Sequence, residues 1–165
     1  MDLNDGQPDP LDALATQFTA ALALKHAGKL DKAEDLLKAI IRAEPRLPEP
    51  HMEYARILLD SDRLADAESH AREALDHLAA SGPWTSEIPS HIVRGLAWAL
   101  LAEVLRRIAD EDDVIFGDPD RFRALLEESQ DAFTKAAKLD PSDEYASYHA
   151  FFLGPRGHGS SGPTS

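Results

Sequence analysis

The chain has 165 residues, of which 43% are hydrophobic and 28% are charged, and it contains no cysteine. A chain of this size can fold as one globular domain that needs no metal ion or disulfide to hold its core together. The missing cysteine excludes disulfides, thiol nucleophiles and cysteine-ligated zinc. Asp and Glu outnumber Lys and Arg by 30 to 17, and this negative charge repels phosphate groups, which argues against nucleic acid and anionic lipid as partners.

The sequence carries no recognisable targeting segment. Its start, MDLNDGQPDP, lacks the basic and apolar runs of a signal peptide. No apolar run approaches the roughly 18 residues that a membrane span requires. We therefore expect a cytoplasmic protein without membrane insertion.

Helix-forming residues dominate, and prolines and glycines divide the chain into helix-sized segments. Asp9 followed by Pro10 is typical of a helix start, with an N-cap side chain and proline in the first turn. The tail 1–9 is acidic and the tail 154–165 is rich in Gly, Ser and Pro, so we expect both to be disordered. The predicted fold class is all-α, with helices at 10–27, 31–44, 49–61, 64–80, 90–109, 120–139 and 142–153.

The chain is similar to itself at an offset of 34 residues. Each copy has the pattern of a helix, a short turn and a second helix that crosses the first through small residues. The offset pairs Leu24 with Leu58, Leu30 with Leu64, Ala33 with Ala67, Leu37 with Ala71 and Ile40 with Ala74. This helix–turn–helix pattern resembles the tetratricopeptide repeat (TPR).

A third, interrupted copy extends the resemblance. Trp98, Leu101, Ala102 and Leu105 resemble the first-helix pattern of the family, and Ser129, Phe133, Ala136 and Pro141 resemble its second-helix pattern. Insertions of about 13 and 15 residues, around 81–91 and 110–120, fall at helix junctions, where repeat proteins tolerate them. The resemblance implies a right-handed superhelical solenoid over 10–153, with units at about 14–47, 48–81 and 92–141 and a capping helix at 142–153.

The resemblance also implies a binding groove, because the first helices of stacked hairpins line a concave face that holds peptides. The residues it places there are mainly apolar: Phe18, Leu22, Met52, Arg56, Leu59, Leu96, Ala99, Leu100 and Arg106. Some TPR domains bind a C-terminal carboxylate through Lys, Asn and Arg, but Glu53 and apolar residues stand at those positions here. We therefore expect an apolar segment or an amphipathic helix as ligand. The N-terminal segment, the 81–91 insertion or a second copy of the chain are the competing occupants.

Three residues form the best candidate metal site in the sequence. His70, Glu73 and His77 share one face of a predicted helix. No fourth ligand is near in sequence and no His-Glu-x-x-His pattern occurs, so we interpret them as an exposed polar face and predict no metal or cofactor. Gly-x-Ser-x-Gly and glycine-rich phosphate-loop patterns are also missing, so we predict no enzyme activity. Trp98 is assigned to the core.

The insertion at 110–120 sets six carboxylates around Val114, Ile115 and Phe116. Repulsion between the carboxylates favours an extended loop, whereas three adjacent large apolar side chains favour docking on a surface. They could dock on the domain itself, or they could form a second contact for a basic partner that the acidic residues steer.

These features together predict a non-catalytic module or scaffold that binds a peptide or helix of another protein. Two alternatives stay open. One is a small acidic chaperone of the secretion type, whose client is the apolar segment of an exported protein. The other is a structural oligomer in which the groove is a self-interface.

Overall fold

The computed structural model describes residues 9–140 and 142. This part of the chain forms seven α-helices and no strand, which confirms the predicted all-α class. The helices are α1 (Pro10–His26), α2 (Leu30–Ala43), α3 (Pro48–Asp60), α4 (Leu64–Ser81), α5 (Ser90–Ala109), α6 (Asp112–Ile115) and α7 (Pro119–Leu139). All except α6 match a predicted range to within one residue at each end. The predicted capping helix at 142–153 lies outside the described residues, as do tail residues 1–8 and 154–165.

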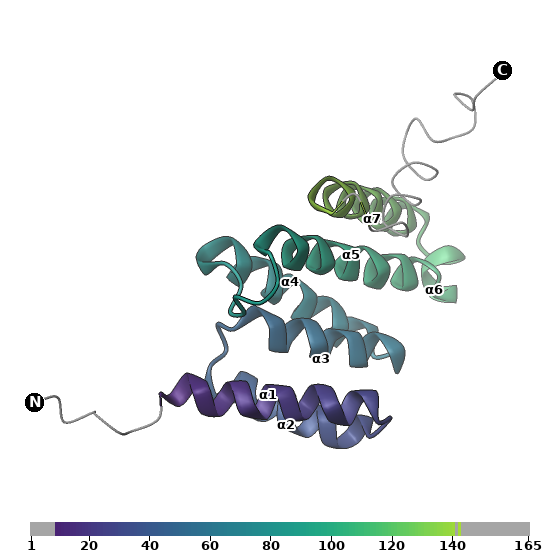
Figure 1. Cartoon of the computed structure of the whole chain (residues 1–165). Helices are drawn as coiled ribbons and strands as arrows, with labels where there is room; N and C mark the ends of the chain where they lie inside the picture. Colours follow the sequence, from purple (N-terminus) through teal and green to yellow (C-terminus); the bar gives the residue numbers. More distant parts are fainter. Residues whose placement is uncertain (1–8, 141, 143–165) are drawn as a thin grey trace, which may run out of the picture.

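The long helices pack in pairs that follow one another in chain order (Figure 1). The pairs are α1 with α2, α3 with α4, and α5 with α7, and α2 against α3 and α4 against α5 join each pair to the next. The short helix α6 lies between α5 and α7 in sequence and contacts both. Among the described helices, none combines the length and the apolar character that a membrane span requires.

The turns within the first two pairs are built alike. Gly28 ends the turn after α1 with φ +77°, and Asp62, its equivalent after α3, has φ +60°. The next residue in each turn, Lys29 or Arg63, donates its backbone N–H to a carbonyl five residues earlier at 2.8 Å. This is the Schellman arrangement, in which a left-handed residue lets the chain reverse and satisfies the last carbonyls of the helix.

Small residues lie where the paired helices cross. Ala33 on α2 and Ala67 on α4, which the 34-residue offset aligns, are both 0% exposed. In the third pair, the Ser129 hydroxyl donates to the Ala102 carbonyl at 2.9 Å, so α7 approaches the backbone of α5 closely. A Cβ on Gly95 of α5 would lie 3.2 Å from Asp140 Cβ, which shows the same close approach near the end of α7. One core cluster continues from α1 through to α5.

Candidate interaction site

The residues predicted to line a groove fall into two groups by exposure. Phe18, Leu22, Met52, Arg56 and Arg106 are partly exposed, and Leu96 is 45% exposed. Leu59, Ala99 and Leu100 are 3%, 5% and 3% exposed and belong to the core. The expectation that these three side chains line an accessible groove is therefore wrong. The physical reason is that both helices have neighbours on several sides: α5, which carries Ala99 and Leu100, contacts α3, α4 and α7, and α3, which carries Leu59, contacts α2, α4 and α5.

The partly exposed side chains come from α1, α3 and α5, and ion pairs connect these three helices. The Lys25 ammonium lies 2.5 Å from a Glu53 carboxylate oxygen and joins α1 to α3. The Arg56 guanidinium lies 2.6 Å from Glu103 and joins α3 to α5. Arg56 is therefore already paired, so its charge is not free to select an acidic ligand.

The insertion before α5 covers part of the predicted groove. The Trp84 ring lies 5.6 Å from the Phe18 ring of α1, measured between centroids. The buried Glu49 carboxylate on α3 holds this loop in place, because it accepts backbone N–H groups from Trp84 at 2.9 Å and Thr85 at 2.7 Å. Of the competing occupants considered for the groove, the 81–91 insertion is thus observed at Phe18. Leu22, Met52 and Leu96 keep exposed surface.

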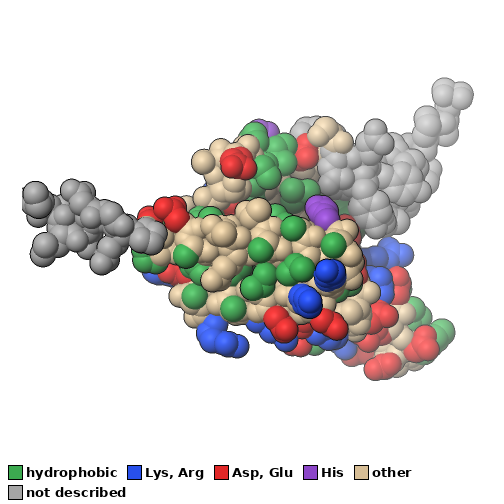
Figure 2. Space-filling view, turned by 60° about the horizontal axis from the view of Figure 1, so that its bottom comes forward, with side chains coloured by type: hydrophobic (Ala, Val, Ile, Leu, Met, Phe, Trp, Pro, Cys, Tyr) green, Lys and Arg blue, Asp and Glu red, His purple; other side chains and the backbone are tan. Residues whose placement is uncertain are grey.

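Helix α1 leaves much of its apolar surface uncovered. Ala21 is its one buried residue, although Leu11, Leu14, Phe18 and Leu22 lie along the same helix. The face that α1 and α2 form comes forward in Figure 2, where patches of hydrophobic side chains are scattered over a largely uncharged area and most charged side chains lie around its edge. On α2, Leu30 is 42% exposed, whereas its repeat equivalent Leu64 is 9% exposed.

The acidic insertion is not an extended loop. Residues Asp112–Ile115 form α6, whose hydrophobic anchor is Val114 at 2% exposure. Backbone hydrogen bonds from Val114 and Ile115 to the Glu111 carbonyl close the turn, and burial of Val114 supplies an attraction that opposes the charge repulsion. Ile115 is partly exposed, and Phe116 is 82% exposed. One of the three apolar residues therefore docks on the domain, and Phe116 remains available for a second contact.

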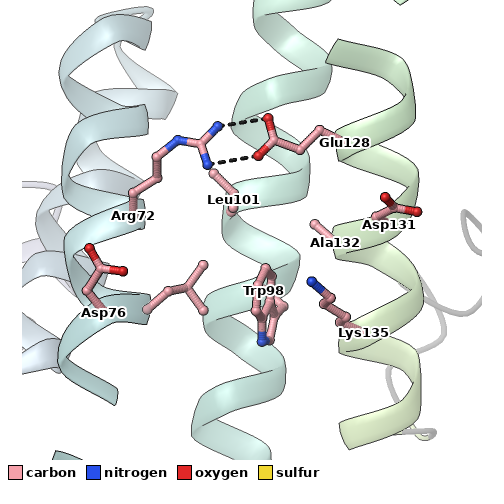
Figure 3. Close-up of a pocket in the computed structure, with 9 residues that line it drawn as sticks. Arg72, Asp76, Trp98, Leu101, Glu128, Asp131, Ala132 and Lys135 are labelled. Atoms are coloured by element: carbon pink, nitrogen blue, oxygen red, sulfur yellow. Dashed lines mark hydrogen bonds and ion pairs between the residues drawn. The ribbon is translucent and has the colours of Figure 1, made fainter. Parts of the chain in front are cut away.

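A pocket of about 280 Å³ lies between α4, α5 and α7 (Figure 3). At one end, the Arg72 guanidinium forms two hydrogen bonds with the Glu128 carboxylate, at 2.8 and 2.9 Å. At the other, the Lys135 ammonium lies 4.3 Å from the centre of the Trp98 ring. Trp98, which the sequence analysis assigned to the core, is only partly buried and lines this pocket. Because both cations already have partners, the pocket offers little unpaired positive charge to a ligand.

The structure also gathers side chains that can ligate a metal. His70 and Glu73 of α4 come together with His51 of α3, and their potential ligand atoms all lie within 4.8 Å of one another. His51 is 0% exposed, and its Nδ1 lies 2.9 Å from His70 Nδ1 and 3.3 Å from Glu73 Oε2. His77 is not a member of this group; its ring stacks on His51 at 5.5 Å.

Sequence reasoning missed His51, although one signal was present. In an antiparallel helical hairpin, residues at equal distances from the turn face each other. Glu73 lies as far after the turn residue Asp62 as His51 lies before it. The pKa values of His51 and His70 are both lowered, mainly because burial disfavours the charged imidazolium. Both rings are therefore neutral near neutral pH.

Comparisons with models of known protein families and with curated proteins found no match to this chain. The assignment of function therefore depends on the chain's own residues.

Proposed function

We propose that this chain is a non-catalytic protein-interaction module of TPR-like architecture, which binds an apolar peptide or an amphipathic helix of another protein. Two features support the architecture. The turns after α1 and α3 share their positive-φ residue and their hydrogen bonds at the offset of 34 residues. The alanines that this offset aligns are buried where the paired helices cross.

The observation that carries the binding role is the uncovered apolar surface of α1. A helix with Leu, Phe and Ala on most sides and one buried residue leaves apolar area in water. Contiguous exposed apolar area on a folded protein marks a contact surface for another chain. Met52 on α3 is partly exposed and Leu96 on α5 is 45% exposed, so the first helix of each pair carries at least one exposed apolar side chain.

The charge distribution defines the partner further. The chain carries a net charge of −13, and two cations on the first helices, Lys25 of α1 and Arg56 of α3, are paired with carboxylates. A partner segment with apolar residues on one side and basic residues at its margins is therefore attracted, and an acidic segment is repelled. The secretion-type chaperone is the special case in which this segment belongs to an exported protein.

Affinity capture from the native cell with matched variants tests the proposal. Leu22→Glu places a charge on the proposed surface, whereas Ala124→Glu places the same charge on the exposed side of α7. We expect the unmodified chain and Ala124→Glu to capture the same protein and Leu22→Glu to lose it, with circular dichroism confirming that all three are folded. Equal capture by all three would contradict a binding surface on α1.

Self-association is a second candidate, and the exposure of Leu30 favours it. Its repeat equivalent Leu64 is covered within the stack, so the outer face of the first pair has the composition of a surface that another unit can cover. A second copy of the chain would supply that cover. Sedimentation equilibrium distinguishes the two, because only self-association predicts a mass that rises with concentration and that Leu30→Glu returns to the monomer.

A further inference from the structure

The cluster of His51, His70 and Glu73 has the composition of a metal site. Two imidazoles and one carboxylate are a donor set that proteins use to bind zinc with three protein ligands. Calcium and magnesium prefer oxygen ligands throughout, so two nitrogen donors favour a transition metal instead. We propose that His51, His70 and Glu73 bind a single Zn²⁺ ion that ties α3 to α4, independently of the interaction surface on α1.

Two of the three ligand-atom distances are close to the spacing that zinc requires, and all three atoms lie within 4.8 Å of one another. Zn–N and Zn–O bonds of about 2.0–2.2 Å in a tetrahedron place neighbouring ligand atoms about 3.3–3.5 Å apart. The distance from His51 Nδ1 to Glu73 Oε2 is 3.3 Å, which agrees. The distance between the two Nδ1 atoms is 2.9 Å, so the His70 ring has to move outward by about half an ångström to admit the ion. His70 is partly exposed whereas His51 is fully buried, so we assign the movement to the His70 ring.

A backbone carbonyl fixes the state of His51. Its Nε2 lies 2.7 Å from the Pro45 carbonyl oxygen, which can only accept a hydrogen bond, so Nε2 carries the proton. The neutral ring therefore directs the lone pair of Nδ1 toward His70 and Glu73. Zinc-binding histidines are commonly oriented in this way by a backbone carbonyl or a carboxylate on the other ring nitrogen.

The candidate zinc site is enclosed by aromatic side chains on one side and open to solvent on the other. His51 is fully buried, with the His77 ring stacked on it, and Tyr54 packs edge-on against His70 with 4.6 Å between centroids. The Glu73 side chain is 49% exposed and gives the ion access from solvent. Three protein ligands leave a fourth position for water or for a side chain of a partner.

Isothermal titration of the untagged, full-length chain with ZnCl₂ tests the site. We expect saturable binding of one ion per chain at neutral pH, with a higher melting temperature in zinc. Titration with CoCl₂ should produce the strong visible absorption of four-coordinate Co²⁺. Loss of one ligand should weaken binding by about tenfold or more, since even a residue that only orients a ligand contributes roughly that much.

Matched variants locate the binding. His70→Ala and Glu73→Gln remove ligands, whereas His77→Phe keeps a stacked ring beside His51 and Asp76→Asn removes a neighbouring exposed acid on the same helix. We expect the first two to weaken binding and the last two to leave it unchanged. Because Glu73 is exposed, Glu73→Gln remains informative if His70→Ala unfolds. No saturable binding, or equal binding in Glu73→Gln and Asp76→Asn, would overturn the proposal and leave a hydrogen-bonded histidine pair.

Discussion

Gly28 and Asp62 occupy the same position in two successive helical turns, and both have positive φ, at +77° and +60°. The left-handed region is strained for a residue with a Cβ, least so for Asn and Asp and not at all for Gly. The two copies of the turn thus have the same left-handed backbone conformation with different residues, Gly28 in one and Asp62 in the other. Asp62 also contacts the Arg107 side chain, which links the second turn to α5.

Gly28→Ala measures the free-energy cost of the left-handed backbone conformation separately from any steric clash. A Cβ on Gly28 would meet no atom within 4 Å, so the substitution creates no steric clash. The left-handed φ alone should cost about 1–2 kcal/mol in free energy of unfolding, measured by urea denaturation. Gly28→Asn should cost less, because Asn tolerates this region. Equal stability of Gly28→Ala and the unmodified chain would show that the turn relaxes to another conformation.

Ala67→Leu tests the crossing of α3 and α4. Ala67 is 0% exposed within the main core cluster, so the larger side chain has to displace its neighbours. We expect the free energy of unfolding to fall by about 1–3 kcal/mol. Ala65→Leu makes the same change at an exposed position of the same helix and should have little effect. A melting temperature that responds equally to both substitutions would contradict close packing at this crossing.

Glu34 should make stability depend on pH. The Arg63 guanidinium forms two 2.7 Å hydrogen bonds with the Glu34 carboxylate and, with Lys38, lowers its pKa to about 2. Because the folded pKa is depressed, the stabilisation is present above the unfolded pKa of about 4.5 and is lost as pH falls toward about 2.

The comparison between the unmodified chain and Glu34→Gln measures this contribution. Because Arg63 is partly solvent-exposed, we expect Glu34→Gln to lower the free energy of unfolding by about 1–2 kcal/mol at neutral pH. The difference should shrink at about pH 3. Glu127→Gln, an exposed change on α7, controls for the loss of one negative charge. A difference that stays constant with pH would assign the effect to packing.

The sequence predicted the helices well and the exposure of the expected groove residues poorly, for different physical reasons. Helix ends depend on local signals, such as Asp9 accepting the Leu11 N–H at the start of α1, and these signals are visible in a short window. Exposure depends on which neighbours surround a helix. The same limit applies to His51, whose partners lie on another helix. Helix α6 was missed because its acidic composition concealed the single buried anchor, Val114.

Leu96 and Leu100 lie one turn apart on α5 but differ in exposure. Substitutions at the two positions therefore test stability and binding separately. Leu100 is 3% exposed, so Leu100→Glu buries an unpaired carboxylate and should destabilise the fold by several kcal/mol, roughly 3–5. Leu96 is 45% exposed, so Leu96→Glu should leave the free energy of unfolding within about 0.5 kcal/mol of the unmodified value. If the partner reaches α5, Leu96→Glu should also weaken its binding. Thermal denaturation and capture of the partner measure the two effects separately.

Val114 and Phe116 divide the acidic insertion into a structural and an accessible part. Val114 is 2% exposed and Phe116 is 82% exposed, although they lie two residues apart. Val114→Ser should lower the free energy of unfolding by about 1–3 kcal/mol, because it loses apolar burial and places a hydroxyl in the core. Phe116→Ser should leave stability unchanged, since the ring makes little contact with the domain.

If Phe116 forms a second contact for a basic partner, Phe116→Ser weakens binding. Added salt should then slow association of the unmodified chain, because it screens the surrounding carboxylates. Unchanged binding and salt-independent association would leave α6 with the structural role of Val114 alone.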